Sequence, residues 1–353
     1  MTWDGPGSRG PRTRTALLAL GWAVLVCSSL PVKAQDQPGT FFHGKQMRIV
    51  VGSAAGGGYD LFARIVARHM TRHISGNPTI VVQNLPAAGG IVMTNQLFSI
   101  GPKDGTVIGA PINGIPAAPL LQPSAAHFDA TKLNWLGSTN REPYVAFLWH
   151  AVPVHGIAEL TNKQVTVGAT TPGTTMVDFP LLVNDVLGLK FRIVRGYEST
   201  PQINYAIERG EVEGMGGIGW ASVKAQTPHW IAEKKIRVIG QYGLKRYPEL
   251  GDIPTMLELA KSEPDAQAMR MLFARTEYGR PYFLPPDVPA ERVQVLRRAF
   301  DATMKDPQFV ADAARLKLDI DPMTGEEVQA LVGELARTPP EIVARVRGAL
   351  EAR

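Results

Sequence analysis

The sequence is almost free of cysteine. Cys27 is the one cysteine among 353 residues, which excludes disulfide bonds within the chain, zinc sites built on several cysteines and, beyond residue 27, thiol nucleophiles. At roughly 100–200 residues per domain, a chain of this length corresponds to about two domains. Such a chain buries enough apolar surface to fold without cross-links or a structural metal.

The signature sequences of common enzyme classes are also missing. The chain has no G-x-x-x-x-G-K-[ST] phosphate loop, no G-x-S-x-G nucleophile turn and no H-E-x-x-H metal motif. His69 and His73 have the spacing of two zinc ligands, but they lack acidic partners nearby, which favours a partly solvated helix face. We therefore expect a protein that is not an enzyme and that needs no metal or cofactor.

Positive charge is not concentrated anywhere in the chain. No run of five or more Lys or Arg occurs, so the sequence gives little support for nucleic-acid binding. The formal net charge is +5, and it falls to +2 if residues 1–34 are removed.

These N-terminal residues have the three parts of a secretory leader. Basic residues at 9, 12 and 14 precede the apolar stretch 16–30, which is shorter than the ~20 residues of a membrane span, and Val32-Lys33-Ala34 marks a cleavage site before Gln35. We expect the leader to be removed and the mature protein to lie in the periplasm. An uncleaved anchor, a buried helix and a lipoprotein built on Cys27 are the alternatives.

Two segments of the mature chain begin in a similar way. A β-branched run at 47–51 leads into the glycine-rich turn 52–60, and apolar residues at helical spacing follow. A second run at 164–167 leads into the turn 168–175 and another apolar helical segment. The remaining strand and helix signals alternate, and the segment from Pro289 onward is almost wholly helical. The pattern predicts an α/β fold with mostly parallel sheets and a helical C-terminal segment.

The two turns are candidate anion sites. The first amides of a helix have no partner within the helix, and the helix dipole adds partial positive charge there, so two such ends facing each other would clamp a carboxylate without Lys or Arg. The candidate residues are Ser53, Ala54, Ala55, Gly56, Gly57, Gly58, Tyr59 and Asp60 in the first turn, and Thr170, Thr171, Gly173, Thr174 and Thr175 in the second. Ordinary tight turns are the alternative interpretation of both segments.

Asp60 stands apart in this set because a carboxylate at a helix start repels an anion. It is expected to cap the amides of its own helix, or to accept a bond from a ligand ammonium or hydroxyl. Asn113 follows a strand, where open α/β sheets place ligand groups, although a turn role is equally compatible. Tyr197 and Trp220 are candidates for lining a cleft, with burial in the core as the alternative.

Several motifs resemble the extracytoplasmic solute receptors of the tripartite tricarboxylate transporter family, the Bug or TctC-like receptors. They are the segment GGYDLFAR from Gly57 to Arg64, the turn NLPAAGG from Asn84 to Gly90, KDGT at 103–106 and DIPTMLE at 252–258. Departures from the family pattern include Ala54-Ala55 in place of proline and threonines where a serine-rich second loop is common.

The resemblance implies a two-lobed receptor with a type II periplasmic-binding-protein fold. Residues 35–140 and 250–353 would form one lobe, and residues 141–249 the other. The ligand, a small carboxylate, would be held by the segments 54–60 and 170–175 and delivered to a two-component membrane permease. We expect a monomer. A sensing protein on the same fold and an exported hydrolase that uses Asp60 as its base are the alternatives.

Overall fold

The structure, a computed structural model, describes residues 40–351. These residues belong to one compact unit, which spans Gln37–Arg353. The predicted leader, its cleavage site and Cys27 lie outside the described residues. A search of the described helices finds none that combines the length and the apolar character needed to cross a bilayer.

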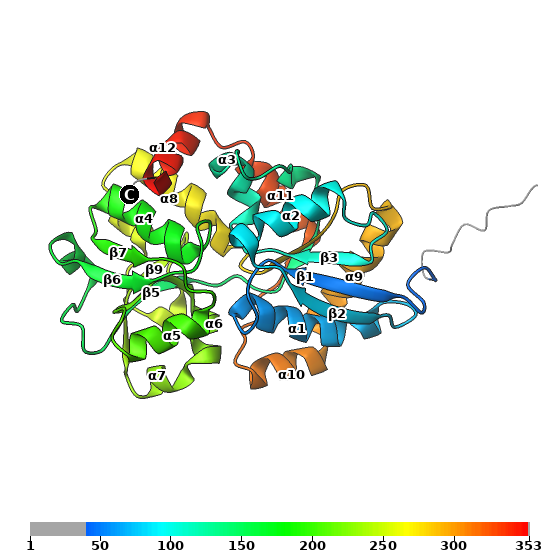
Figure 1. The fold of residues 1–353 in the computed structure, drawn as a ribbon, viewed down its shortest axis with the longest axis horizontal. Coiled ribbons are helices and arrows are strands. Elements are labelled where there is room, and N and C mark those ends of the chain that lie inside the picture. The colour runs from blue at the N-terminus through cyan, green and yellow to red at the C-terminus, as the bar shows by residue number, and fades with distance from the viewer. Residues whose placement is uncertain (1–39, 352–353) are drawn as a thin grey trace, which may run out of the picture. The chain divides into compact units, whose positions relative to one another are not determined.

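The first sheet has six strands in the order β11-β4-β10-β3-β1-β2, and its strands β1, β2 and β3 lie side by side in Figure 1. Its strands are β1 (Gln46–Val51), β2 (Thr79–Asn84), β3 (Val107–Ala110), β4 (Asn134–Ser138), β10 (Pro281–Leu284) and β11 (Met323–Thr324). The central strand β1 is parallel to both β2 and β3. The pairs β10·β3, β10·β4 and β11·β4 are antiparallel.

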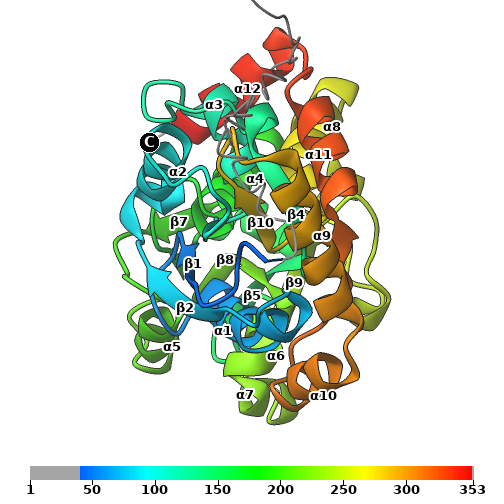
Figure 2. The ribbon, with the colours of Figure 1, turned by 90° about the vertical axis from the view of Figure 1, so that its right-hand side faces the viewer.

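Helices cover both faces of this sheet. They are α1 (Gly58–Met70), α9 (Ala290–Lys305) and α10 (Pro307–Arg315) on one face, and α2 (Ile91–Ser99) and α11 (Gly325–Leu335) on the other. Helix α10 lies beside α1 (Figure 1, Figure 2). β1 alternates its side chains between the two layers, with Ile49 in the cluster of Phe62 and Val50 in the cluster of Met93. This explains why Ile49, Val50 and Val51 are all apolar and buried, whereas Gln46 and Arg48 at the start of the strand are exposed.

The second sheet has five strands in the order β7-β6-β8-β5-β9. Its strands are β5 (Tyr144–Trp149), β6 (Val165–Gly168), β7 (Phe191–Val194), β8 (Gly214–Gly219) and β9 (Ile236–Tyr242). One apolar layer combines α4 (Thr175–Leu187), α8 (Glu263–Phe273) and α12 (Pro340–Glu351), and the short α3 (Ala118–Leu121) contacts α12. The other layer combines α5 (Thr200–Glu208), α6 (Trp220–Gln226) and α7 (Pro228–Ala232).

The predicted α/β class with two sheets and a helical C-terminal segment is confirmed. Parallel pairing is limited to the neighbours of β1 and of β6, and both sheets are mixed. Every antiparallel pair contains β4, β5 or β10, the strands at which the chain passes between the sheets. The chain leaves the first sheet after β4 and enters the second at β5, and it returns to the first sheet at β10 after β9.

The division into one lobe of residues 35–140 with 250–353 and another lobe of residues 141–249 stays a prediction. Two helices of the range 250–353 pack beside the second sheet and not beside the first. Phe273 of α8 and Val346 of α12 share one apolar cluster with Phe179 of α4, beside the second sheet. The C-terminal segment therefore contributes to both halves of the core.

Candidate functional site

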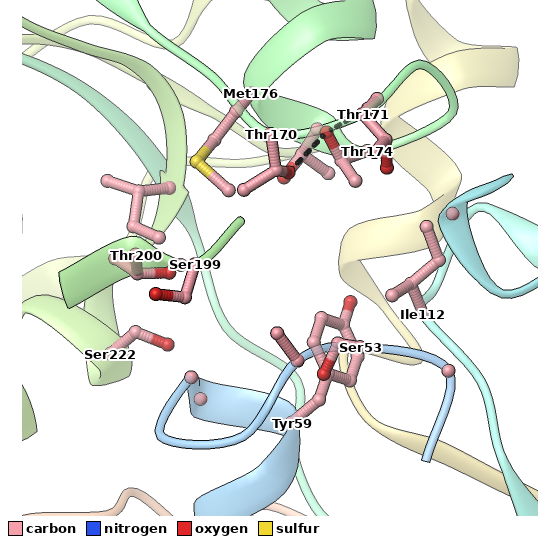
Figure 3. A pocket seen from close by; sticks show the side chains of 18 of the residues that line it. Ser53, Tyr59, Ile112, Thr170, Thr171, Thr174, Met176, Ser199, Thr200 and Ser222 are labelled. Atoms are coloured by element: carbon pink, nitrogen blue, oxygen red, sulfur yellow. Dashed lines mark hydrogen bonds between the residues drawn. The ribbon is translucent and has the colours of Figure 1, made fainter. Parts of the chain in front are cut away.

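A pocket lies where strands of both sheets end. It collects loops that follow the carboxyl ends of β1, β3 and β6, which is the usual place for ligands in α/β folds. It is lined by Gly52, Ser53, Ala54, Gly57, Gly58, Tyr59, Pro86, Gly89, Ile112, Asn113, Tyr144, Thr170, Thr171, Thr174, Thr175, Met176, Glu198, Ser199, Thr200, Ile218, Gly219, Ser222 and Arg280. Figure 3 shows side chains from both sheets pointing into one space.

Helices α1 and α4 both begin at this pocket. Gly57 is the N-cap of α1 and Thr174 is the N-cap of α4, and neither residue makes a capping bond through its side chain. Both N-caps line the pocket, as do the first residues of each helix. The first amides of each helix lack partners inside the helix, and the dipoles place partial positive charge at both ends. Both ends therefore carry amides and a positive dipole end of the kind that can hold an anion, and both line the same pocket.

The loops that carry these ends are fixed by two aspartates. Asp60 accepts hydrogen bonds from the Gly56 amide and from Arg64 Nε, both at 2.9 Å. Asp178 accepts from the Gly173 amide at 3.1 Å and from the buried Arg275 at 3.0 Å. Each carboxylate thus ties the loop before its helix and is neutralised by an arginine, so neither adds free negative charge to the pocket.

The environments of these two aspartates differ. Burial disfavours the charged form of Asp60, but the bonds from Arg64, Gly56 and Asn84 outweigh that cost and lower its pKa. Burial raises the pKa of Asp178, an effect that Arg275 opposes. Asp60 does not line the pocket, and its oxygens face its own loop and Asn84. It therefore acts in building the first turn.

Arg280 lines the pocket and was not predicted. Its side chain is 3% exposed, and its Nη1 lies 2.5 Å from Glu142 Oε1. Nη1 also donates to Tyr144 Oη at 3.0 Å, and Nη2 donates to Ser222 Oγ at 2.9 Å. Burial opposes the charge, but Glu142 and Tyr144 outweigh that cost and raise the pKa of Arg280. The guanidinium is therefore charged, and Glu142 neutralises it.

Hydroxyl groups supply most of the remaining polarity. The buried Ser53 Oγ has no hydrogen-bond partner among the described residues. Thr174 Oγ1 donates to the Thr171 carbonyl at 2.7 Å and lies 3.4 Å from Thr170 Oγ1. Ser199, Thr200 and Ser222 lie on the side of the pocket opposite Ile112 (Figure 3). Ser53 is thus the hydroxyl with an unmet hydrogen bond, whereas the hydroxyl of Thr174 is used within its own loop.

Ten of the sixteen predicted residues line the pocket: Ser53, Ala54, Gly57, Gly58, Tyr59, Asn113, Thr170, Thr171, Thr174 and Thr175. Six do not: Ala55, Gly56, Asp60, Gly173, Tyr197 and Trp220. Gly56 and Gly173 have φ of +81° and +86°, so these glycines serve the turns. Tyr197 and Trp220 pack in or against the apolar cluster beneath α5 and α6.

Asn113 has a bracing role within the pocket wall. Its side-chain amide donates to Tyr144 Oη and to the Arg275 carbonyl, at 3.0 and 3.1 Å. Its backbone amide donates to Tyr59 Oη at 3.0 Å. These bonds join a loop of the first sheet to β5 of the second sheet and to the segment after α8.

Close contacts between glycines and opposing loops bring the two sheets together around the pocket. A Cβ atom at Gly58 would collide with Ser222 Oγ, and one at Gly114 would collide with the Gly173 carbonyl oxygen. A Cβ at Gly89 would lie 2.8 Å from the Pro172 carbonyl oxygen. Glycine is therefore required at these positions because backbone and side chains approach so closely.

The histidine pair has no zinc geometry. His69 Nε2 lies 2.8 Å from Asp312, and His73 Nε2 lies 2.9 Å from Asp306, so each histidine contacts a different aspartate at α10. Within residues 40–351 no group of three or more His, Cys, Asp or Glu side chains is arranged to hold a metal ion.

The sequence signals missed 13 of the 23 residues that line the pocket. Tyr144, Arg280 and the 198–200 segment come from parts of the chain without a glycine-rich motif, and Arg280 lies 136 positions from Tyr144. Ser222 follows the glycine-rich strand β8. The Ser199-Thr200-Pro201 sequence at the start of α5 is a helix-start signal, but the sequence alone does not place this helix at the pocket.

Comparison with known proteins agrees with this fold. The family model described as the tripartite tricarboxylate transporter family receptor matches residues 62–346. Among solved structures, the periplasmic binding protein BugD is 22% identical with a TM-score of 0.68, covering 87% of this chain and 98% of that chain. Rpa4515 of R. palustris with adipate is 20% identical with a TM-score of 0.67, covering 86% and 98%.

A third structure, MatC from Rhodopseudomonas palustris with bound malate, is 18% identical with a TM-score of 0.66, covering 87% of this chain and 99% of that chain. These likenesses confirm the predicted type II periplasmic-binding-protein fold. The family is one of solute-binding receptors and not a class of enzymes. Because the family model covers most of the sequence, the chain belongs to the receptor family of the tripartite tricarboxylate transporters.

Proposed function

We propose that this receptor captures a small carboxylate in the pocket between α1 and α4 and delivers it to a two-component membrane permease. In this proposal the leader 1–34 directs the protein to the periplasm, where the mature chain acts as a monomer without metal or cofactor. The segments 35–140 with 250–353 and 141–249 act as lobes that close on the ligand. Transport, and not signalling, is the function that the receptor family favours.

One observation carries the proposal: the N-termini of α1 and α4 line the same pocket, and neither N-cap residue makes a capping hydrogen bond through its side chain. The ligand carboxylate accepts bonds from amides of Gly57, Gly58 and Tyr59 on one side and of Thr175 and Met176 on the other. The Ser53 hydroxyl, which has no partner among the described residues, adds a further donor.

The magnitudes are consistent with this arrangement. Each helix end contributes about 0.3–1 kcal/mol and up to ~2 kcal/mol when partly buried, so the two together give at most ~4 kcal/mol. Micromolar binding needs about 8 kcal/mol. Hydrogen bonds to a charged group at roughly 1.5–3 kcal/mol each supply the difference, which means that the amides and hydroxyls act together and that the dipoles alone do not suffice.

Two of the structurally similar proteins have bound carboxylates, adipate in Rpa4515 and malate in MatC, which supports a carboxylate ligand here. A hydrolase that uses Asp60 as its base is disfavoured. The pKa of Asp60 is lowered, its oxygens are engaged by its own loop and by Arg64, and it does not line the pocket.

A thermal-shift screen of the mature protein tests the proposal. The panel contains mono-, di- and tricarboxylates, amino acids and aromatic acids, with uncharged amides and alcohols as controls. At about 100 times Kd a ligand adds ~2.7 kcal/mol of stability, so at least one carboxylate should raise the midpoint while the uncharged controls do not. Stabilisation by no carboxylate, or chemical turnover of the bound compound, would contradict the proposal.

A further inference from the structure

Two tyrosine hydroxyl groups meet in the wall of the pocket. Tyr59 lies in the first turn of α1 and Tyr144 is the first residue of β5, so the pair joins the two halves of the core. Their oxygens lie 3.5 Å apart, and both residues line the pocket. Figure 3 shows Tyr59 rising from α1 into the space between the labelled side chains. The distance alone allows either hydroxyl to be the donor, so the direction of this contact depends on the neighbouring groups.

The oxygen of Tyr144 already accepts two hydrogen bonds. Arg280 Nη1 and Asn113 Nδ2 each donate to it at 3.0 Å. A guanidinium can only donate. The same Asn113 Nδ2 also donates to the Arg275 carbonyl oxygen at 3.1 Å, which identifies it as the nitrogen of the side-chain amide. Because a hydroxyl oxygen accepts two bonds and donates one, Tyr144 has no acceptor position left and can only donate its own hydrogen.

The hydrogen of Tyr144 therefore points to Tyr59, whose oxygen is the acceptor in reach of it among the described residues. Burial raises the pKa of Tyr144 well above its ordinary value, so the hydroxyl keeps this hydrogen. The backbone amide of Asn113 donates to the same Tyr59 oxygen at 3.0 Å. Both acceptor positions of Tyr59 are then occupied. Its own hydrogen meets no acceptor within residues 40–351 and is left for a group inside the pocket.

A charged group stands at the start of this row of hydrogen bonds. The guanidinium of Arg280 donates to Tyr144 and also lies 4.6 Å from the centre of the Tyr59 ring, which helps to hold the ring in place. Hydrogen bonds in a row polarise one another, so the bond from Arg280 strengthens Tyr59 as a donor. Glu142 offsets the charge of Arg280, but it does not reverse the row, because Arg280 Nη1 remains a donor.

We propose that Tyr59 selects the ligand: its hydroxyl donates to an oxygen of the bound acid and cannot accept a hydrogen bond from it. The inference rests on the proposed function, because the first carboxylate of the ligand is held at the N-termini of α1 and α4. The group that meets Tyr59 is a keto oxygen or an oxygen of a second carboxylate. An ammonium group only donates and would face the hydrogen of Tyr59. The ligand class is therefore oxo acids and dicarboxylates, and not amino acids.

The test measures selectivity between matched acids that differ in one group. Calorimetric titration gives Kd for 2-oxobutyrate against 2-aminobutyrate, for succinate against 4-aminobutyrate, and for the longer homologues of both pairs. The variants are Tyr59→Phe, which removes the hydroxyl and keeps the ring, and Tyr144→Phe, which removes the group that fills the second acceptor position of Tyr59. The matched control is Tyr205→Phe, at an exposed tyrosine of α5 that does not line the pocket.

The wild type should bind the acid with the accepting oxygen about tenfold or more tightly than its amino counterpart, in the pair whose second group reaches Tyr59. Tyr59→Phe should lower this ratio about tenfold, whereas Tyr205→Phe should leave it within about twofold. A merely structural role of Tyr59 would weaken both acids of a pair equally and would not move the ratio.

Tyr144→Phe gives a second, independent result. It frees an acceptor position on Tyr59, so it should narrow the same ratio chiefly by tightening the binding of the amino acid. It also takes the place of Tyr59→Phe if that variant fails to fold.

The contradicting outcomes are distinct. A folded wild type that binds these acids without a preference for the accepting oxygen in any pair would overturn the inference. A ratio that stays the same in both tyrosine variants would overturn it as well. Failure of the folded wild type to bind any of the acids would instead count against the proposed function itself.

Discussion

Replacement of Gly57 by valine separates binding from folding. Gly57 has φ −80° and ψ 172°, an extended conformation that a β-branched residue adopts readily. A Cβ placed there lies 3.7 Å from the Ala54 carbonyl oxygen and 4.0 Å from Thr200 Oγ1, with the rest of its surroundings open. The variant should fold with a stability within about 1 kcal/mol of the wild type, because the freedom that the unfolded chain loses offsets the poorer preference of valine for the N-cap position.

The effect of this change on binding should be large. The added methyl groups occupy space in front of the first amides of α1. Loss of two hydrogen bonds to a carboxylate, at roughly 1.5–3 kcal/mol each, corresponds to a weakening of about 100-fold or more. Calorimetric titration with the tightest carboxylate from the screen measures the change, and urea unfolding measures stability.

Gly156→Val is the matched control. Gly156 is also an N-cap in extended conformation, with φ −160° and ψ 164°. A Cβ placed there meets no atom within 4 Å, and Gly156 does not line the pocket. Gly156→Val should bind as the wild type does. If the folded Gly57→Val variant kept its affinity within about twofold, the first helix end would not be the anion site.

Three further changes test other parts of the site. Ser53→Ala should weaken carboxylate binding about ten- to 100-fold by titration with little effect on unfolding, since Ser53 Oγ has no partner among the described residues. Equal affinities would remove Ser53 from the site. Asp60 has a folded pKa below its unfolded value of 3.8, so its stabilising contribution is present above that value and is lost as the pH falls through the folded pKa. The difference in unfolding free energy between wild type and Asp60→Asn should therefore be constant above about pH 5 and shrink in acid, and a pH-independent difference would contradict the assignment. Glu142→Gln should lower the free energy of unfolding by ~3–5 kcal/mol, because the buried pair with Arg280 is broken. It should also raise the affinity for dicarboxylates relative to monocarboxylates, because Arg280 keeps its positive charge without a partner. An unchanged ratio of the two affinities would mean that Arg280 does not act on the ligand.

The two strand-turn-helix segments could be predicted because their information is local. A β-branched run, a glycine with positive φ and a helical segment rich in apolar residues lie within about 25 consecutive residues in each case. The alternation of strands and helices likewise predicted the α/β class. Asp60 was expected to cap the amides of its own helix, whereas the amide that it binds belongs to Gly56, which precedes the N-cap of α1.

The rest of the pocket depends on contacts between distant segments. Arg280 reaches Glu142, Tyr144 and Ser222 only after β10, β5 and α6 have been placed by the two sheets. Tyr197 and Trp220 could be cleft or core residues on composition alone, and their positions follow from the apolar layer beneath α5 and α6. Mixed strand pairing was missed for the same reason, since β10 pairs across the break between the two halves of the chain.

The most direct measurement of the central claim is a crystal structure of the mature protein with its tightest carboxylate ligand. The account predicts one carboxylate whose oxygens lie within hydrogen-bond distance of amides at the start of both α1 and α4. A carboxylate bound by Arg280 alone, or bound outside this pocket with both helix ends free, would contradict it.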